Sequence, residues 1–311
     1  MTYPIIHVPD DASTQLEQLG TKAKFWYRDE TGDSVLFKVG RPGTGENWAE
    51  KVCCEICKVL NIPHAEYNFA QHKGVMGTVT PSFVPKEGRL ILGNELLAKF
   101  VKGYDQRLTY STNQHTLNRV IALLKKLSLN ESSMLALSAP IGWAMPEEVG
   151  NPIGIFVGYL LLDALVGNQD RHHENWGIIA SPNDGLSLTP TFDHASSLGR
   201  NETDVRRLGR LNSNDHLRSV EYYVTRARSG LFPSVSAKKA YTTVEAFTEI
   251  AKMNIAAGRY WLEQLSRLQV VDFDHIFEEI PDSVISDAAR LFAVQMLKVN
   301  KNRLLNVGSS L

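Results

Sequence analysis

The stretch from Asp163 to Asp193 constrains the fold of this chain more than any other, because its pattern of apolar and polar residues changes several times. An apolar run with helical spacing ends at Gly167-Asn168. A dense polar cluster, Asp170 to Asn175, follows at once. Two short β-like runs come next, joined by the turn Pro182-Asn183-Asp184-Gly185. The sequence therefore predicts a helix, a polar loop and a hairpin whose second strand leads to Asp193.

Three side chains of this stretch fit the chemistry of phosphoryl transfer. That reaction needs a carboxylate beside the acceptor hydroxyl, and oxygen ligands that hold Mg²⁺ on the nucleotide phosphates. Asp170 and Asn175 lie five residues apart on one loop, which matches the Asp-x-x-x-x-Asn spacing of a kinase catalytic loop. The hairpin then returns a second carboxylate, Asp193, to the same place. We expect Asp170 to be catalytic and Asn175 and Asp193 to bind the metal.

The order of residues around the predicted catalytic Asp differs from that in conventional protein kinases. Those enzymes carry His-Arg before the catalytic Asp and Phe-Gly after the metal-binding Asp. Here Arg171-His172 follow Asp170, and the later Asp closes Pro190-Thr191-Phe192-Asp193. The wording G-N-x-D-R-H-x-x-N-W-G followed by P-x-F-D resembles the signature of HipA-like serine/threonine kinases, and most of all their short single-chain members. The match is strong over residues 163–197 and fainter over residues 20–61.

The resemblance implies an α+β, two-lobed, protein-kinase-like fold. Residues 1–83 would form a small β-rich N-lobe with one main helix. Residues 84–311 would form a mostly helical C-lobe that carries the catalytic loop 168–175. It also implies ATP and Mg²⁺ as cofactors and a role for His172 in organising the loop beside the nucleotide phosphates.

The N-terminal part supplies candidates for nucleotide binding. Strand candidates at residues 23–27 and 34–39 are joined by a turn, and the second ends near Lys38. In a kinase such a lysine contacts the α- and β-phosphates. The loop before the hairpin contains Gly20 and Thr21, and we expect it to cover the phosphates. A solvated strand residue is the alternative for Lys38.

A helix predicted over residues 46–60 offers a partner for this lysine. Its apolar residues recur at three- and four-residue spacing, so one face is buried. Glu50 lies beside that face and is the expected partner of Lys38, with Glu46 and Glu55 as competitors. A surface glutamate on an amphipathic helix is the alternative.

An extended, proline-flanked segment follows the next predicted hairpin. Thr80 to Pro85 cannot continue as a helix, and in a two-lobed kinase this connector offers backbone groups to adenine. Thr80 and Ser82 are the candidates, and we place the lobe boundary near Phe83.

One carboxylate interrupts the apolar helix that precedes the catalytic loop. A buried Asp163 needs hydrogen-bonding partners. Backbone amides or Arg171 are the expected ones.

Charge and hydropathy limit the classes of binding partner that we expect. With 33 Lys and Arg against 34 Asp and Glu, the net charge of -1 gives no reason to expect direct DNA binding. Seven arginines between residues 200 and 228 form either a solvated surface or a local patch for a phosphorylated or tRNA-bearing substrate. No apolar run reaches the roughly 20 residues of a membrane span. We expect no membrane contact and a cytoplasmic location, with export as an effector left open.

The three cysteines, Cys53, Cys54 and Cys57, fall on one predicted helix. A zinc site needs a fourth ligand and usually a second ligand pair on a separate loop. Reduced, buried thiols are the simpler expectation.

Other chemistries compete with protein phosphorylation. Asp170, His172, His173 and Glu174 could form a metal-hydrolase site, although we expect no direct role for His173 and Glu174. A small-molecule or lipid kinase would use the same site with a deeper acceptor pocket. A non-catalytic kinase-like binding module is a further alternative.

The resemblance also bears on partners. It implies a protein substrate, a toxin or effector role, and an antitoxin partner protein. We expect the extra N-terminal subdomain of full-length HipA to be missing, which weakens the expectation of antitoxin docking. Autophosphorylation in the phosphate-covering loop is implied as well, with Ser13, Thr14 and Thr21 as candidates.

Overall fold

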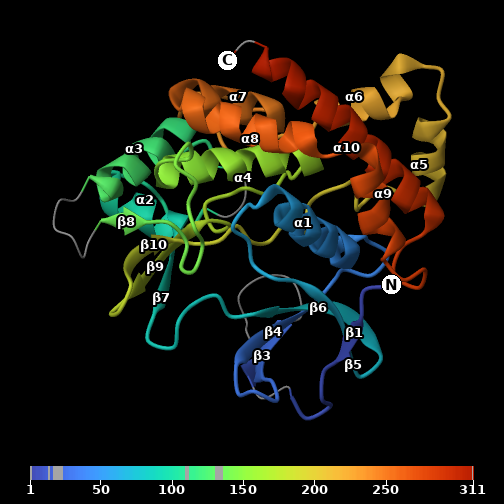
Figure 1. Cartoon of the computed structure of the whole chain (residues 1–311), viewed down its shortest axis with the longest axis horizontal. Coiled ribbons are helices and arrows are strands. Elements are labelled where there is room, and N and C mark those ends of the chain that lie inside the picture. The colour runs from blue at the N-terminus through green and yellow to red at the C-terminus, as the bar shows by residue number, and fades with distance from the viewer. Residues whose placement is uncertain (1, 13–14, 17–23, 109–111, 130–135, 310) are drawn as a thin grey trace.

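The structure is a computed structural model that describes residues 2–12, 15–16, 24–108, 112–129, 136–309 and 311. A twisted six-stranded sheet and a large helical part lie on opposite sides of helix α1, Glu46–Leu60 (Figure 1). This arrangement is the expected α+β, two-lobed one.

The six-stranded sheet has the order β1-β5-β6-β4-β3-β2. Its strands are β1 Ile5–His7, β2 Gln15–Leu16, β3 Lys24–Arg28, β4 Ser34–Val39, β5 Asn68–His72 and β6 Val75–Pro81. All neighbours are antiparallel except β1 and β5. Alternate side chains of β3 and β4, among them Phe25 and Phe37, form a small apolar core on one face. Lys38, next to Phe37 in β4, therefore points to the opposite face.

Helix α1 joins the sheet to the rest of the molecule. Its apolar face, including Val52 and Ile56, belongs to the main hydrophobic core together with the long C-terminal helices. The helix ends at Asn61, which takes a left-handed conformation (φ 53°) and caps it with its backbone N–H. Because α1 packs on both parts, it fixes Glu50 between them.

A second sheet of four strands lies at the edge of the helical part. Its order is β7-β9-β10-β8, with β7 Arg89–Leu92, β9 Gly177–Ser181, β10 Gly185–Leu188 and β8 Leu137–Ser138. The helices are α2 Gly93–Phe100, α3 Leu117–Ser128, α4 Pro152–Val166, α5 Asp204–Leu211, α6 Val220–Thr225, α7 Thr243–Met253, α8 Ile255–Arg267, α9 Val270–Glu278 and α10 Asp287–Gly308, with a 3₁₀ turn at His216–Arg218.

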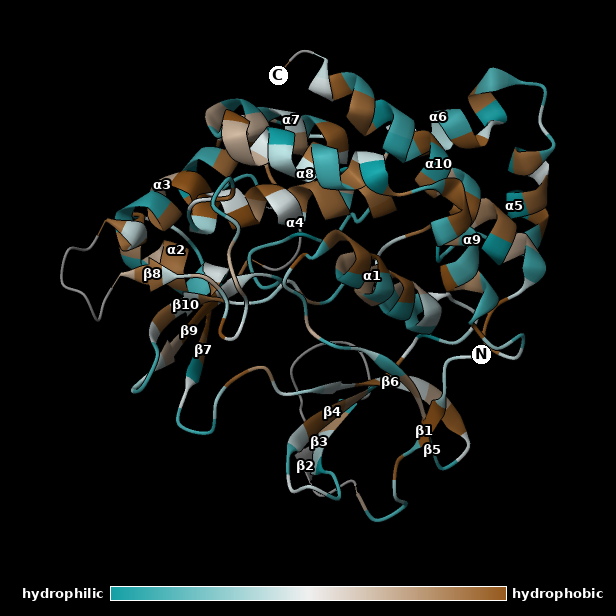
Figure 2. Cartoon of the chain, viewed as in Figure 1, coloured by the Kyte–Doolittle hydropathy of each residue, from teal (hydrophilic) through white to brown (hydrophobic). Residues whose placement is uncertain are grey.

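Helix α4 is the centre of the core. Nearly all of its residues are buried, and it is mostly brown in Figure 2, whereas α5 alternates teal and brown. Asn151 caps its first turn, and Gly167 ends it with φ 66°. Helices α7, α8 and α10 cover α4, so the loop that leaves Gly167 starts from a rigid support. No helix in the described ranges is long and apolar enough to cross a membrane.

The elements expected around the site are present. Both hairpins, α1 and the helix that ends at Val166 form as predicted. The sequence reasoning missed α5 and α6, whose polar surroundings resemble a loop. The apolar spacing of Ser132 to Leu137 predicts a helix, but Leu137 pairs with β10 as a strand, and residues 132–135 lie outside the described residues.

The close approach of α4 and α8 generates a prediction. A Cβ on Gly158 would lie 2.6 Å from the Trp261 ring, which is held in place because its Nε1–H donates to the Gly154 carbonyl oxygen. We expect Gly158→Ala to lower the free energy of unfolding by about 1–3 kcal/mol, since this clash outweighs the roughly 1 kcal/mol that alanine contributes inside a helix. Urea unfolding measures it. Gly209→Ala in α5, where a Cβ meets open space, should stabilise instead.

Candidate active site

A buried ion pair shapes the loop of residues 168–175. Arg171 and Asp163 are both almost completely buried, and the guanidinium donates two hydrogen bonds to the carboxylate, at 2.8 Å from Nε and 2.7 Å from Nη2. The side-chain amide of Asn168 donates to the same carboxylate at 2.8 Å. Arg171 is thus the partner expected for Asp163, joined by an amide side chain rather than a backbone group.

The same guanidinium connects the loop to the strand that leads to Asp193. Its Nη1 donates to the Asn175 carbonyl oxygen (2.7 Å), and its Nη2 donates to Thr191 Oγ1 (2.9 Å). Each of the three guanidinium nitrogens donates at least one hydrogen bond, so the buried charge is compensated. One arginine therefore sets the relative positions of α4, the loop and the residue two positions before Asp193.

Asp170 lies at the surface of this loop with its side chain 33% exposed. Its backbone N–H donates to Asn168 Oδ1, and Ser196 Oγ donates to its carboxylate at 3.3 Å. The Asn175 amide nitrogen donates to the Asp170 carbonyl oxygen at 2.7 Å, so Asn175 has its side-chain oxygen left for another ligand. Asp170 is both held in place and accessible, as a group that meets a substrate hydroxyl must be.

Asp193 takes a left-handed backbone conformation, with φ 57°. This region is sparsely populated by residues other than glycine, and such strain gathers at functional sites. The Asp193 N–H donates to Tyr67 Oη at 3.2 Å, which links it to the segment between α1 and β5. The Asp193 carboxylate and the Asn175 side-chain oxygen offer the oxygen ligands that Mg²⁺ prefers.

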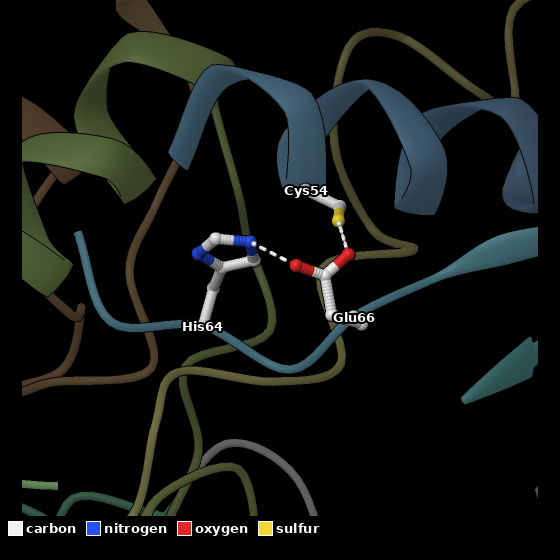
Figure 3. A group of neighbouring side chains, drawn as sticks. All are labelled: Cys54, His64 and Glu66. Atoms are coloured by element: carbon white, nitrogen blue, oxygen red, sulfur yellow. Dashed lines mark hydrogen bonds and ion pairs between the residues drawn. The ribbon is translucent and has the colours of Figure 1, made fainter. Parts of the chain in front are cut away.

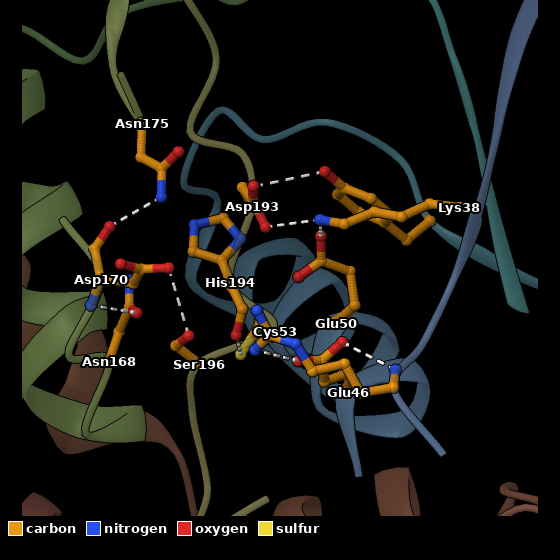
Figure 4. A network of polar contacts seen from close by, with 12 residues as sticks. Lys38, Glu46, Glu50, Cys53, Asn168, Asp170, Asn175, Asp193, His194 and Ser196 are labelled. Atoms are coloured by element: carbon orange, nitrogen blue, oxygen red, sulfur yellow. Dashed lines mark hydrogen bonds and ion pairs between the residues drawn. The ribbon is translucent and has the colours of Figure 1, made fainter. Parts of the chain in front are cut away.

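Lys38 joins the two parts of the molecule (Figure 4). Its Nζ donates to Asp193 Oδ1 at 2.5 Å and lies 3.6 Å from Glu50 Oε1. Burial alone would lower the pKa of Lys38, but the carboxylates of Asp193 and Glu50 outweigh it and raise the pKa above its ordinary value. The lysine therefore stays charged, as a ligand of phosphate must.

The other two candidate glutamates of α1 form ion pairs with residues other than Lys38. Glu46 forms ion pairs with Arg41 and Arg200. Glu55 contacts Lys51 and Lys58. Of the three candidates, Glu50 is the one that the structure brings to Lys38.

The other expected site residues are spread around this centre. His172 Nε2 lies 3.6 Å from Asp170 Oδ1, and its Nδ1 accepts a hydrogen bond from the Glu174 N–H. Thr80 lies in β6, and the Ser82 N–H donates to the Ser34 carbonyl oxygen, beside the lysine strand. Gly20 and Thr21 lie outside the described residues.

A pocket of about 330 Å³ opens beside Asp170, and the sequence indicated only part of its lining, through the loop 168–175 and Arg228. Asp170 and His172 line one side, and residues 228–240 line the other, including the cations Arg228, Lys238 and Lys239. Gly230 presses on the catalytic loop so closely that a Cβ would lie 2.5 Å from the Arg171 carbonyl oxygen. Its own carbonyl accepts a hydrogen bond from His115 Nδ1. The wall is therefore an ordered part of the site.

Comparison with known proteins agrees with this geometry. Residues 16–257 match the family model of the HipA-like C-terminal domain. The chain is similar to the crystal structure of the Helicobacter pylori proinflammatory kinase CtkA, with 19% identity, a TM-score of 0.71, and coverage of 99% of this chain and 98% of that one. It is also similar to HipA of the Shewanella oneidensis MR-1 toxin–antitoxin system in complex with HipB and operator DNA, with 13% identity, a TM-score of 0.53, and coverage of 95% and 66%. A search of curated proteins finds no match.

Fold and site together define a two-lobed, kinase-like protein. The family model covers most of the chain, so the chain belongs to the HipA-like C-terminal domain family. The family and the fold support a kinase-type phosphoryl-transfer function. Because both sequence identities are low, the two solved structures establish the fold and do not identify the substrate.

The buried ion pair generates a prediction about stability. Asp163→Asn keeps the shape but leaves the Arg171 charge uncompensated in the core, so the free energy of unfolding should fall by about 3–5 kcal/mol. Chemical denaturation with circular dichroism measures it. Glu249→Gln, which removes an exposed ion pair with Lys252, should change stability by less than about 1 kcal/mol. Similar losses in both variants would contradict a special role for the buried pair.

Proposed function

We propose that this chain is an ATP- and Mg²⁺-dependent kinase that phosphorylates serine or threonine hydroxyls of a protein. The observation that carries the proposal is the contact of Lys38 with Glu50 and with Asp193, which lies 155 residues further along the chain. We propose the lobes themselves as residues 1–83 and 84–311.

Each residue has a distinct proposed role. Asp170 accepts or orients the proton of the acceptor hydroxyl, and Lys38, steadied by Glu50, holds the nucleotide phosphates. Asn175 and Asp193 hold Mg²⁺, which when bound neutralises the charge that develops on the transferred group. Thr80 and Ser82 offer backbone groups to adenine, and Gly20 and Thr21 cover the phosphates. His172 orders the loop beside them.

The pocket beside Asp170 supports an anionic acceptor. Three cations line it, and the single carboxylate in its lining is Asp170 itself. A hydroxyl flanked by carboxylates or phosphates would place its negative groups against Arg228, Lys238 and Lys239. We therefore propose an acidic protein segment as the acceptor. The second candidate is a small anionic alcohol, because the volume reaches the lower end of the roughly 300–1,000 Å³ of small-molecule sites.

Partners and location remain proposals drawn from the family. HipA of the neighbouring structure is bound to HipB and operator DNA. We propose an antitoxin-type partner protein for this chain too, and a cytoplasmic site of action. We also propose autophosphorylation at Ser13, Thr14 or Thr21, which lie outside the described residues.

The catalytic assignment is tested by separating transfer from binding. With Mg²⁺ and ATP, we expect the wild type to gain phosphate, on itself or on added protein, by intact-mass analysis. Asp170→Asn should lower the rate roughly 10²–10⁴-fold while nucleotide still raises the melting temperature. Asp193→Asn should lose the Mg²⁺-dependent part of that shift. Lys252→Met, on an exposed face of α7, is the control. The kinase proposal would be rejected if the folded protein did not bind ATP, did not hydrolyse it and did not transfer its phosphate.

The acceptor pocket is tested with serine peptides that differ only in flanking charge. Glu-flanked peptides should be better substrates than Ala- or Lys-flanked ones. The double variant Lys238→Glu/Lys239→Glu should lower kcat/KM for the Glu-flanked peptide by roughly five- to tenfold, with ATP affinity unchanged. Lys252→Glu/Lys298→Glu is the charge-matched control. An equal loss in both pairs, or no preference among the peptides, would reject the acidic acceptor, and transfer to small anionic alcohols would be assayed in its place.

A further inference from the structure

Three side chains of different metal-binding types converge beside α1 (Figure 3). Cys54 comes from the middle of α1, and His64 and Glu66 come from the segment between α1 and β5. Their ligand atoms all lie within 4.8 Å of one another. The sequence placed Cys54 among three cysteines of one helix, and the tertiary fold supplies the partners from a separate segment.

The distances match a tetrahedral metal centre. Zinc bonds of about 2.3 Å to sulfur and 2.0–2.1 Å to nitrogen or oxygen place neighbouring ligand atoms about 3.3–3.6 Å apart. His64 Nε2 lies 3.4 Å from Glu66 Oε1, and Cys54 Sγ lies 3.6 Å from Glu66 Oε2. An ion can therefore enter with side-chain adjustments alone.

Hydrogen bonds around the cluster orient two of the three groups for a metal. His64 Nδ1 lies 2.7 Å from the Ile62 carbonyl oxygen, which can only accept, so Nδ1 is the protonated nitrogen. Nε2 is buried, and its contact with Glu66 Oε1 at 3.4 Å shows that it points into the cluster. The Tyr67 N–H donates to Cys54 Sγ at 3.4 Å, so the sulfur is already an acceptor. Such contacts fix the tautomer of a histidine ligand and support a thiolate.

We propose that Cys54, His64 and Glu66 bind one Zn²⁺ ion, with water as the fourth ligand. A thiolate and an imidazole select zinc over Mg²⁺ or Ca²⁺, which prefer oxygen ligands only. Thiolate and carboxylate together neutralise the two positive charges of the ion. Glu66 is about half exposed, so the site has an entrance from solvent.

The site is placed to stiffen the active centre. Cys54 lies one helical turn after Glu50 on α1. The segment that carries His64 pairs with Thr191, through the Ala65 N–H to the Thr191 carbonyl and the Thr191 N–H to the Pro63 carbonyl, both at 2.9 Å. Tyr67, next to Glu66, accepts the N–H of Asp193. A bound ion would thus tie the helix of Glu50 to the segment that holds Asp193.

A competing arrangement contains no metal. Lys58 Nζ lies 2.9 Å from Glu66 Oε2, and a protonated His64 would add a second cation to the same carboxylate. The two arrangements differ in whether the Cys54 sulfur is a thiolate bound to a metal ion. The absorption spectrum of bound Co²⁺ distinguishes them, because thiolate ligation gives a charge-transfer band.

The test is titration of the chelator-treated, full-length protein with Co²⁺ alone, without nucleotide. We expect a thiolate-to-cobalt charge-transfer band that saturates at one equivalent, disappears when Zn²⁺ is added, and is unaffected by millimolar Mg²⁺. Zn²⁺ should also raise the melting temperature. Cys54→Ser should abolish the band, and His64→Asn should weaken Co²⁺ binding at least roughly tenfold.

Cys57→Ala is the matched control, because Cys57 is buried on the same helix outside the cluster and its loss should leave the band in place. No band in the folded wild type would overturn the proposal, even if a variant failed to fold. A band that persists in Cys54→Ser would do so as well. Kinase activity enters neither outcome, so the result is independent of the proposed phosphoryl transfer.

Discussion

The buried pairing of Arg171 with Asp163 is the constraint on which the site depends. A guanidinium in the core is tolerated only when all its donors find acceptors, and here those acceptors belong to α4, the catalytic loop and the strand end before Asp193. Satisfying one charge therefore fixes three segments at once. Because α4 is itself enclosed by apolar helices, that geometry rests on the most rigid part of the molecule.

The second requirement is a connection across the two lobes, and Lys38 provides it. Its strand belongs to the six-stranded sheet, whereas Asp193 belongs to the helical part and Glu50 to the helix between them. The lysine and Asp193 neutralise each other. If the proposed kinase function holds, phosphate and Mg²⁺ would each replace one partner of that pair, and the contact would keep both groups charged and aligned.

Local patterns were enough to predict much of this arrangement. The spacing of Asp170 and Asn175, the hairpin that returns to Asp193, and the amphipathic helix that carries Glu50 all depend on residues close in sequence. Elements without a clear period were missed: α5 is short and rich in arginine, and β8 pairs in parallel with a strand far along the chain. Tyr67 gave no signal, and the wall of residues 228–240 gave one only at Arg228, because the importance of these residues comes from contacts with distant segments.

The sequence by itself determined the secondary structure around the site, the chemical identity of its polar residues and the family to which the chain belongs. Only the tertiary structure decided which of three glutamates meets Lys38, what neutralises Asp163, and that one of three neighbouring cysteines faces a histidine and a glutamate from another segment. The physical reason is that spacing along a helix or strand sets the direction of a side chain. Its partner is set by how whole elements pack to bury their apolar faces, a choice made over the entire chain.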